Sequence, residues 1–257
     1  MLIDLSVSNR IACSTLNRPD ALNAINQTLL DDLEAALHAT ASDTEVDVVI
    51  VTGTGRAFCA GSDIKELEGV SPAEAGRMIR REAEICRLFE EIPQPTIAAI
   101  EGYALGGGAA LTLYQNIRVA SETALFGFPE VKLGWNPAFG MARLSRLVGE
   151  GPAAFLMMSG HTISADEALR IGLVDRVVPP PSLMETAREM AERIARNPSV
   201  GVQAIKKIMQ GETLLSPYEA DDTELCAFVE CIDKEDAQKR IRAFAARRLK
   251  GKNGKDR

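Results

Sequence analysis

The sequence has few of the residues that build metal, redox or disulfide sites. Its two histidines, His38 and His161, are too few and too far apart for a histidine-based metal site. The five cysteines form no C-x-x-C pair and are odd in number, which predicts reduced thiols that mostly serve as small core residues. We therefore expect neither a bound metal nor a disulfide framework.

Long apolar runs and an excess of positive charge are also missing. No run approaches the roughly 20 apolar residues that span a bilayer, and no charged-then-apolar leader opens the sequence. The net charge of −7 disfavours non-specific binding to nucleic acid or anionic membrane. We expect a cytoplasmic protein with a small-molecule substrate. The basic stretch from Arg247 to Arg257 is interpreted as a solvated tail, with an anionic ligand or a neighbouring subunit as alternatives.

The apolar content that is present is enough for one large domain, or for one domain with a small appendage. The chain has 257 residues, of which 46% are hydrophobic. Loose alternation over residues 5–16 predicts a strand, and apolar spacing over 26–38 predicts a helix. The β-branched run at 47–52 is typical of a strand buried on both faces of a parallel sheet.

Capping signatures of the form S-x-x-E predict four helix starts. They occur at residues 71–74, 164–167, 182–185 and 216–219. Strand, loop and helix signals alternate up to residue 198, and from residue 199 onward the pattern is helical. We therefore place a boundary there, with a core over 1–198 and a helical C-terminal region over 199–257.

Two glycine-bearing turns are the most informative part of the sequence. The first is Gly53-Thr54-Gly55-Arg56-Ala57-Phe58-Cys59-Ala60-Gly61-Ser62-Asp63-Ile64, and the second contains Gly102-Tyr103-Ala104-Leu105-Gly106-Gly107-Gly108. Each follows an apolar strand. Three successive glycines are favoured where main chain approaches a ligand closely and presents its N–H groups to it. Neither turn fits a nucleotide phosphate loop, and Ser62 lacks the G-x-S-x-G frame of a serine hydrolase.

The two turns together resemble the paired signatures of the crotonase superfamily, the enoyl-CoA hydratase/isomerase family. The resemblance lies in Val48–Leu67 and Ile97–Leu113. It continues in three further blocks and so covers essentially the whole chain: Leu16–Ala24, Phe126–Gly134, and Ile163–Ala165 through Gly172–Val174.

This resemblance implies an α/β fold, a crotonase-like spiral of repeated ββα units with a C-terminal helical trimerisation region. It also implies an acyl-CoA substrate, no separate cofactor, since coenzyme A is part of the substrate, and a homotrimer or a hexamer built as a dimer of trimers. The C-terminal region would cover the site. Phe244 and the basic residues after it would meet the phosphates of coenzyme A.

The family resemblance also implies the residues of the site. The backbone N–H groups of Ser62 and Gly107 would form an oxyanion hole for a thioester enolate, where one such donor commonly contributes about 3 kcal/mol. Glu130 would be the single acid/base, because Ala110 stands where a typical hydratase has its other glutamate. The main chain that would contact substrate lies in two segments. Trp135, where the sequence departs from the small residues common in the family, either shapes the acyl pocket together with Phe139 or is an ordinary core residue. The substrate-binding set is Leu22, Ala24, Ala60, Ser62, Asp63, Ile64, Lys65, Gly107 and Trp135.

The departure at Ala110 leaves several activities open. A single carboxylate moves protons readily but activates water poorly, which favours double-bond isomerisation over hydration or dehydration. A coenzyme A thioester-binding member without hydratase activity is an alternative, as is a decarboxylase or hydrolase that uses the same oxyanion hole. Asn116, which stands where the family has an aspartate, predicts a changed structural hydrogen bond. Tyr114, one helical turn beyond Ala110, is interpreted as a core residue, with a replacement acid as the alternative.

Overall fold

The computed structural model describes residues 1–211, 235 and 239, in two compact units, Met1–Ala195 and Arg196–Arg257. In the second unit it describes the helix α9, Ser199–Gly211. Several predictions lie outside the described residues: the helix start at 216–219, Phe244 and the basic tail. Trimerisation, and the placement of the site in a core over 1–198, therefore stay predictions. Among the described helices, none is both long and apolar enough to cross a bilayer.

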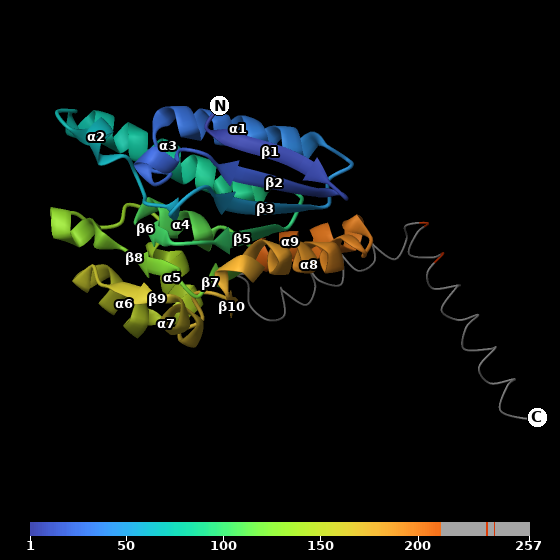
Figure 1. Cartoon of the computed structure of the whole chain (residues 1–257). Coiled ribbons are helices and arrows are strands. Elements are labelled where there is room, and N and C mark those ends of the chain that lie inside the picture. The colour runs from blue at the N-terminus through green and yellow to red at the C-terminus, as the bar shows by residue number, and fades with distance from the viewer. Residues whose placement is uncertain (212–234, 236–238, 240–257) are drawn as a thin grey trace, which may run out of the picture. The chain divides into compact units, whose positions relative to one another are not determined.

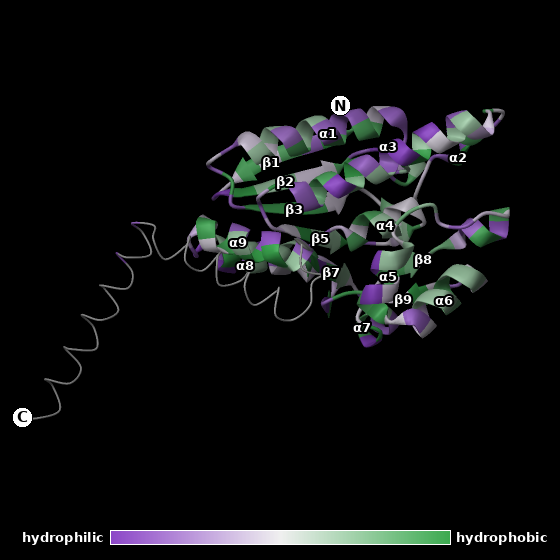
Figure 2. Cartoon of the chain, turned by 180° about the vertical axis from the view of Figure 1, so that it is seen from behind, coloured by the Kyte–Doolittle hydropathy of each residue, from purple (hydrophilic) through white to green (hydrophobic). Residues whose placement is uncertain are grey.

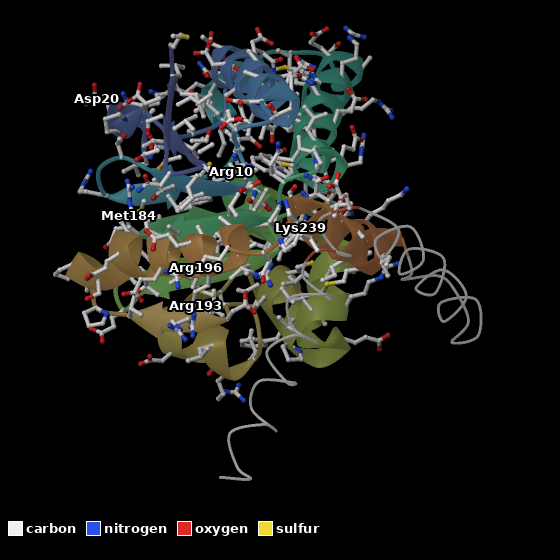
Figure 3. The ribbon with its side chains drawn as sticks, turned by 90° about the vertical axis from the view of Figure 1, so that its right-hand side faces the viewer. Arg10, Asp20, Met184, Arg193, Arg196 and Lys239 are labelled. Atoms are coloured by element: carbon white, nitrogen blue, oxygen red, sulfur yellow. The ribbon has the colours of Figure 1, made fainter. Side chains whose placement is uncertain are left out.

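The N-terminal segment forms a hairpin, so the single strand predicted over residues 5–16 is wrong. Strand β1, Ile3–Ser8, pairs antiparallel with β2, Ile11–Leu16. Asn9 and Arg10 connect them with φ angles of 52° and 64°. Two successive positive φ values are typical of a type I′ turn, whose twist matches a hairpin. Arg10, labelled in Figure 3, forms ion pairs with Asp47 and Glu45 and so ties this turn to the loop before the next strand.

Two sheets carry the spiral (Figure 1). The six-stranded sheet has the order β1-β2-β3-β5-β7-β10, and every pairing from β2 onward is parallel. The four-stranded sheet has the order β4-β6-β8-β9. In the three successive pairs β3–β4, β5–β6 and β7–β8, the first strand enters the large sheet and the second enters the small one. The ββα spiral and the buried strand at 47–52 are thereby confirmed. The remaining strands are β3 Val48–Gly53, β4 Ala57–Cys59, β5 Thr96–Ile100, β6 Tyr103–Leu105, β7 Ile117–Ser121, β8 Leu125–Gly127, β9 Thr162–Ser164 and β10 Arg176–Val178.

Helices cover both faces of the large sheet. Helix α8, Leu183–Ala195, buries Leu183, Ala187 and Ala191 against one face, and Met184 lies partly buried beside them (Figure 3). The opposite face packs against α1, α3 and α4 in the larger core cluster. Figure 2 shows apolar and polar residues alternating around α1 and α3, as helices with one face on a core require. Their bounds are α1 Gln27–Ser42, α3 Pro72–Glu91 and α4 Gly107–Leu113.

Local capping explains where these helices start. The side chains of Asn26, Ser71 and Ser164 accept hydrogen bonds from backbone N–H groups in the first turns of α1, α3 and α7. Helix α8 begins directly after Ser182, so the three predicted starts within the described residues are confirmed. The other helical segments are η1 Pro19–Ala21, α2 Ile64–Leu67, η2 Pro129–Leu133, α5 Met141–Val148, α6 Glu150–Ser159, α7 Ala165–Arg170 and η3 Pro180–Ser182.

Candidate active site

The two glycine-bearing turns lie directly against each other. Gly61 has a φ of +97°, and a Cβ built on it would lie 2.8 Å from the carbonyl oxygen of Leu105. A Cβ on Gly108 would lie 2.2 Å from the carbonyl oxygen of Cys59. Both distances are shorter than any side chain tolerates, so glycine at these positions permits the close approach of the turns.

This approach brings the backbone nitrogens of Ser62 and Gly107 together. A Cβ built on Gly107 would lie 3.5 Å from the nitrogen of Ser62. Standard backbone dimensions then place the two nitrogens within about 6 Å of each other. Two N–H groups at about 2.9 Å from one oxygen span such a separation. Among the described residues, neither of these N–H groups donates to another protein group, so both are free to bind a ligand oxygen.

The two segments predicted to contact coenzyme A also form one structure. The carbonyl oxygen of Leu22 accepts from the Ala60 N–H at 3.0 Å, and Ile25 exchanges hydrogen bonds with Gly61 and Asp63 at 2.8 and 2.7 Å. Asn23, whose side chain is fully buried, donates to the carbonyl oxygens of Thr54 and Ala57. The loop that carries Leu22 and Ala24 is thereby held beside the first turn.

The acidic residue after Ser62 has a structural partner. Asp63 caps α2 and forms an ion pair with Arg18 at 2.8 Å. Burial raises the pKa of the Asp63 carboxyl, but hydrogen bonds and charge from Arg18 outweigh this effect and leave the pKa below its usual range. Arg18 in turn donates to the carbonyl oxygen of Ala24. Ile64 and Lys65 are exposed on α2, so this short helix presents them to solvent beside the predicted coenzyme A segment.

Glu130 lies on η2 against the second turn. A Cβ on Gly106 would lie 2.8 Å from Oε1 of Glu130, so only glycine leaves room for this carboxyl group. Its Oε2 atom is buried and has no hydrogen-bond partner among the described residues. Burial raises the pKa of the Glu130 carboxyl. An unsatisfied buried carboxyl oxygen is costly, and a carboxyl group held in this way beside a turn with a free N–H group is a candidate for proton transfer.

Ala110 occupies the position at which a typical hydratase has its other glutamate. It is 2% exposed, and a Cβ built on Gly140 would lie 3.2 Å from its Cβ. All seven residues of α4, Gly107–Leu113, are buried. Helix α4 therefore contributes the predicted N–H donor of Gly107 but no titratable side chain.

The other departures from the family pattern have structural roles. Asn116 Oδ1 accepts from the backbone N–H and the hydroxyl of Thr96, which confirms the predicted structural hydrogen bond. Tyr114 is buried in the main core beneath the guanidinium of Arg143, as predicted. Phe139 packs on Tyr114 with ring centroids 6.5 Å apart. Trp135 is 45% exposed and donates its backbone N–H to the carbonyl oxygen of Glu130, so its role in an acyl pocket stays a prediction.

Sequence reasoning missed Glu82, a buried glutamate of α3. Its side chain is 3% exposed, and Oε2 accepts a hydrogen bond from the Ser62 hydroxyl at 2.7 Å. A Cβ on Gly107 would lie 3.2 Å from the same oxygen. The signal was present in the sequence, because Glu82 lies on the helical stripe that also contains Ile85, Cys86 and Phe89. A charged residue at a core position marks a site where its carboxyl group meets polar partners.

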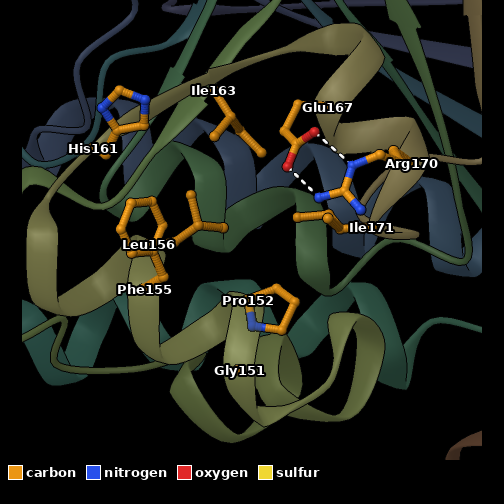
Figure 4. Close-up of a pocket in the computed structure, with 9 residues that line it drawn as sticks. All are labelled: Gly151, Pro152, Phe155, Leu156, His161, Ile163, Glu167, Arg170 and Ile171. Atoms are coloured by element: carbon orange, nitrogen blue, oxygen red, sulfur yellow. Dashed lines mark hydrogen bonds and ion pairs between the residues drawn. The ribbon is translucent and has the colours of Figure 1, made fainter.

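A separate pocket lies between α6, β9 and α7 (Figure 4). Its walls are mostly apolar, and Glu167 and Arg170 close one side through an ion pair. The residues that form it are Gly151, Pro152, Phe155, Leu156, His161, Ile163, Glu167, Arg170 and Ile171. None of them belongs to the two turns or to η2, so this pocket is distinct from the site above.

The spiral of two sheets and the paired glycine turns define a protein of the crotonase superfamily. The chain belongs to the enoyl-CoA hydratase/isomerase family, whose sequence model matches residues 6–252. The short-chain-enoyl-CoA hydratase of Clostridium acetobutylicum is 42% identical over 250 residues, which cover 95% of this chain and 94% of that protein. The crotonyl-CoA hydratase of Syntrophomonas wolfei is 37% identical over 248 residues, which cover 96% and 95%.

Solved structures agree with the family assignment. The enoyl-CoA hydratase from Bacillus anthracis superposes with a TM-score of 0.92 at 34% identity, covering 96% of this chain and 97% of that one. The fold predicted from the sequence is thereby confirmed.

Proposed function

We propose that this protein binds an enoyl-CoA thioester and adds water across its double bond, with an oxyanion hole at Ser62 and Gly107 and with Glu130 as general base. The observation that carries the proposal is the proximity of the Ser62 and Gly107 nitrogens, whose N–H groups have no protein acceptor among the described residues, beside a buried, unsatisfied carboxyl group. Hydration is preferred because the relatives described above are named as enoyl-CoA and crotonyl-CoA hydratases.

The chemistry follows from the positions of these groups. As a nucleophile attacks C3, negative charge develops on the thioester oxygen. Two fixed N–H donors lower the energy of that charge, by about 3 kcal/mol for one donor in comparable sites. Burial raises the pKa of the Glu130 carboxyl group, which shifts it in the direction that a general base working near neutral pH requires. The same arrangement would serve proton removal from C2 or C4.

Double-bond isomerisation is the second candidate, and the observation that favours it is Ala110. Shifting a double bond from C3 to C2 requires one group that removes a proton and returns it two carbons away. Glu130 alone satisfies that requirement, whereas α4 provides no second carboxylate.

The test is to measure hydration of crotonyl-CoA and isomerisation of a 3-enoyl-CoA by the wild type and by Glu130→Gln. We expect Glu130→Gln to lower kcat by a factor of about 10²–10⁴ for whichever reaction the wild type performs. The matched control is Glu122→Gln, which neutralises an exposed glutamate in the turn before β8. Activity on the 3-enoyl substrate alone would favour isomerisation. Full activity of Glu130→Gln on both substrates would refute the proposed role.

A further inference from the structure

Hydration places a demand on this site that Glu130 alone does not meet. Water must lose a proton as its oxygen bonds to C3, and C2 must gain a proton in the same turnover. Two carboxyl groups in opposite protonation states satisfy both needs at once. At position 110, where a typical hydratase has its other glutamate, this chain has an alanine that packs toward Gly140.

Glu82 places a second carboxyl group at the same turn from a different helix. Its Oε2 atom lies 3.2 Å from the Cβ position of Gly107, and Glu130 Oε1 lies 2.8 Å from the Cβ position of Gly106. The two carboxyl groups thus border adjacent residues of one turn. One of these residues is the predicted N–H donor. The Ser62 hydroxyl, which lies 3.3 Å from the Gly107 Cβ position, donates to Glu82 and fixes its orientation.

The surroundings of Glu82 favour its protonated form. Burial is the main cause that raises the pKa of Glu82 to about 7; the hydrogen bond from Ser62 lowers it, and the charges of Glu66 and Glu130 raise it again. The other titratable groups that face it are the buried thiols of Cys59 and Cys86, both of which stay protonated because burial raises their pKa. Among the described residues, no arginine or lysine forms an ion pair with Glu82. A carboxylic acid held in this way is available as a proton donor at neutral pH.

We infer that Glu82 is a catalytic acid of this site, supplied by α3 in place of the carboxyl group that α4 lacks at Ala110; this inference rests on the proposed hydration. Glu130 accepts a proton from water while the water oxygen forms its bond to C3. The π electrons of the C2=C3 bond move to give the enolate, whose oxygen is held by the N–H groups of Ser62 and Gly107. Glu82 gives its proton to C2, and the thioester carbonyl re-forms. A proton then passes from Glu130 to Glu82 through solvent before the next turnover.

The experiment compares two reactions in the same variants. The first is hydration of crotonyl-CoA, and the second is exchange of the C2 protons of butyryl-CoA in D2O, which requires the oxyanion hole and the group that exchanges protons with C2, but no attack of water on C3. We expect Glu82→Gln to lower kcat for hydration by about 10²–10⁴, with a KM within about threefold of wild type, and to slow proton exchange by a similar factor, because the group that protonates C2 also removes a proton from it in the reverse direction. Glu130→Gln should lower hydration but retain most of the exchange. Glu84→Gln, on the exposed face of the same helix, should leave both reactions unchanged.

Three further variants separate catalysis from positioning. Glu82→Asp, which shortens the acid but keeps it, should recover part of the hydration lost in Glu82→Gln. Ser62→Ala removes only the hydroxyl that orients Glu82 and should cost much less than Glu82→Gln. Glu82→Gln combined with Glu130→Gln should be little worse than the more severe single variant, because the two residues act as a unit.

Each contrary result overturns a different claim. Retention of more than a third of wild-type hydration by Glu82→Gln would refute the catalytic acid. A loss in Ser62→Ala equal to that in Glu82→Gln, or a loss confined to KM, would reassign Glu82 to a positioning role and refute the inference. Failure of the proposed function itself has another signature, namely no turnover by the wild type or no effect of Glu130→Gln.

Discussion

Helices α3 and α4 approach the candidate site from neighbouring repeats, and they differ in what they bring to it. Helix α4 is short and entirely buried, and it begins at Gly107, the predicted N–H donor. Helix α3 has 20 residues, exposes one face and buries the other, with Glu82 on the buried stripe. Backbone donors therefore come from the helix without charged side chains, and a carboxyl group comes from the amphipathic one.

This division follows from packing. In this chain the first turn of α4 contains only glycine and alanine, and Ala110 packs toward Gly140, so no long side chain extends from it. A longer helix one layer away reaches the same point with a glutamate side chain. The position of a carboxyl group at such a site is thus a property of the packed fold rather than of one sequence position. The predictions below test this difference, starting with the largest expected effect.

Gly108→Ala should be the most damaging single change in the two helices. Its added Cβ would lie 2.2 Å from the Cys59 carbonyl oxygen, a backbone atom that cannot move aside without displacing the first turn. We expect a loss of more than about 4 kcal/mol in the free energy of unfolding, or failure to fold, measured by urea denaturation. Gly140→Ala is a useful comparison. Gly140 also has a positive φ, of +84°, but a Cβ built there would contact the Ala110 side chain rather than backbone. An intact, active Gly108→Ala protein would show that the turns are not in close contact.

Ala110→Glu tests whether α4 accepts the carboxyl group that it lacks. Position 110 is 2% exposed and its methyl group faces Gly140, so a larger charged side chain must displace neighbours and lose its hydration. We expect a cost of about 3 kcal/mol in stability at pH 8, and a smaller cost for the uncharged control Ala110→Gln. If Ala110→Glu is stable and hydrates crotonyl-CoA faster than wild type, open space exists beside α4 and the contrast with α3 fails.

Glu82 should make stability depend on pH. A carboxyl group whose pKa is raised from 4.5 to about 7 by folding binds its proton more tightly in the folded state. Below pH 4.5 this group is protonated in both states, so its burial does not lower the free energy of unfolding. As the pH rises through 7 the loss in that free energy grows to about 3 kcal/mol. Glu82→Gln removes this penalty, so it should be more stable than wild type at pH 8 and nearly equal at pH 4. Thermal unfolding of both proteins at the two pH values, at one protein concentration, measures the difference. Equal unfolding midpoints of the two proteins at pH 8 would contradict a buried Glu82 carboxyl group with a raised pKa.

The glycine turns, the helix starts and the buried strand were predictable from the sequence because local pattern encodes them, and the spiral was implied by the family resemblance. Three kinds of pattern each predict the local structure in which they lie. They are the glycines at 61 and 106–108, the capping serines at 71 and 164, and the β-branched run at 48–51. The N-terminal hairpin was missed because its turn, Asn9-Arg10, has no glycine although both residues adopt positive φ. Glu82 was missed for a different reason. Its meaning depends on the contact of α3 with Ser62, which is 20 residues away in the chain.

Gly76→Ala should have the smallest effect and leaves the site unchanged. Gly76 lies on the exposed face of α3, and a Cβ built there meets nothing within 4 Å. Alanine restricts the unfolded chain more than glycine, so we expect stability to rise by about 0.5–1 kcal/mol in thermal or urea unfolding. Gly151→Ala, also unobstructed but in the first turn of α6, should gain less because helix propensity counts less near an end. Hydration by Gly76→Ala should equal that of wild type, since the outer face of α3 does not touch Glu82. A loss of activity there would mean that the placement of Glu82 depends on the whole helix rather than on its buried stripe.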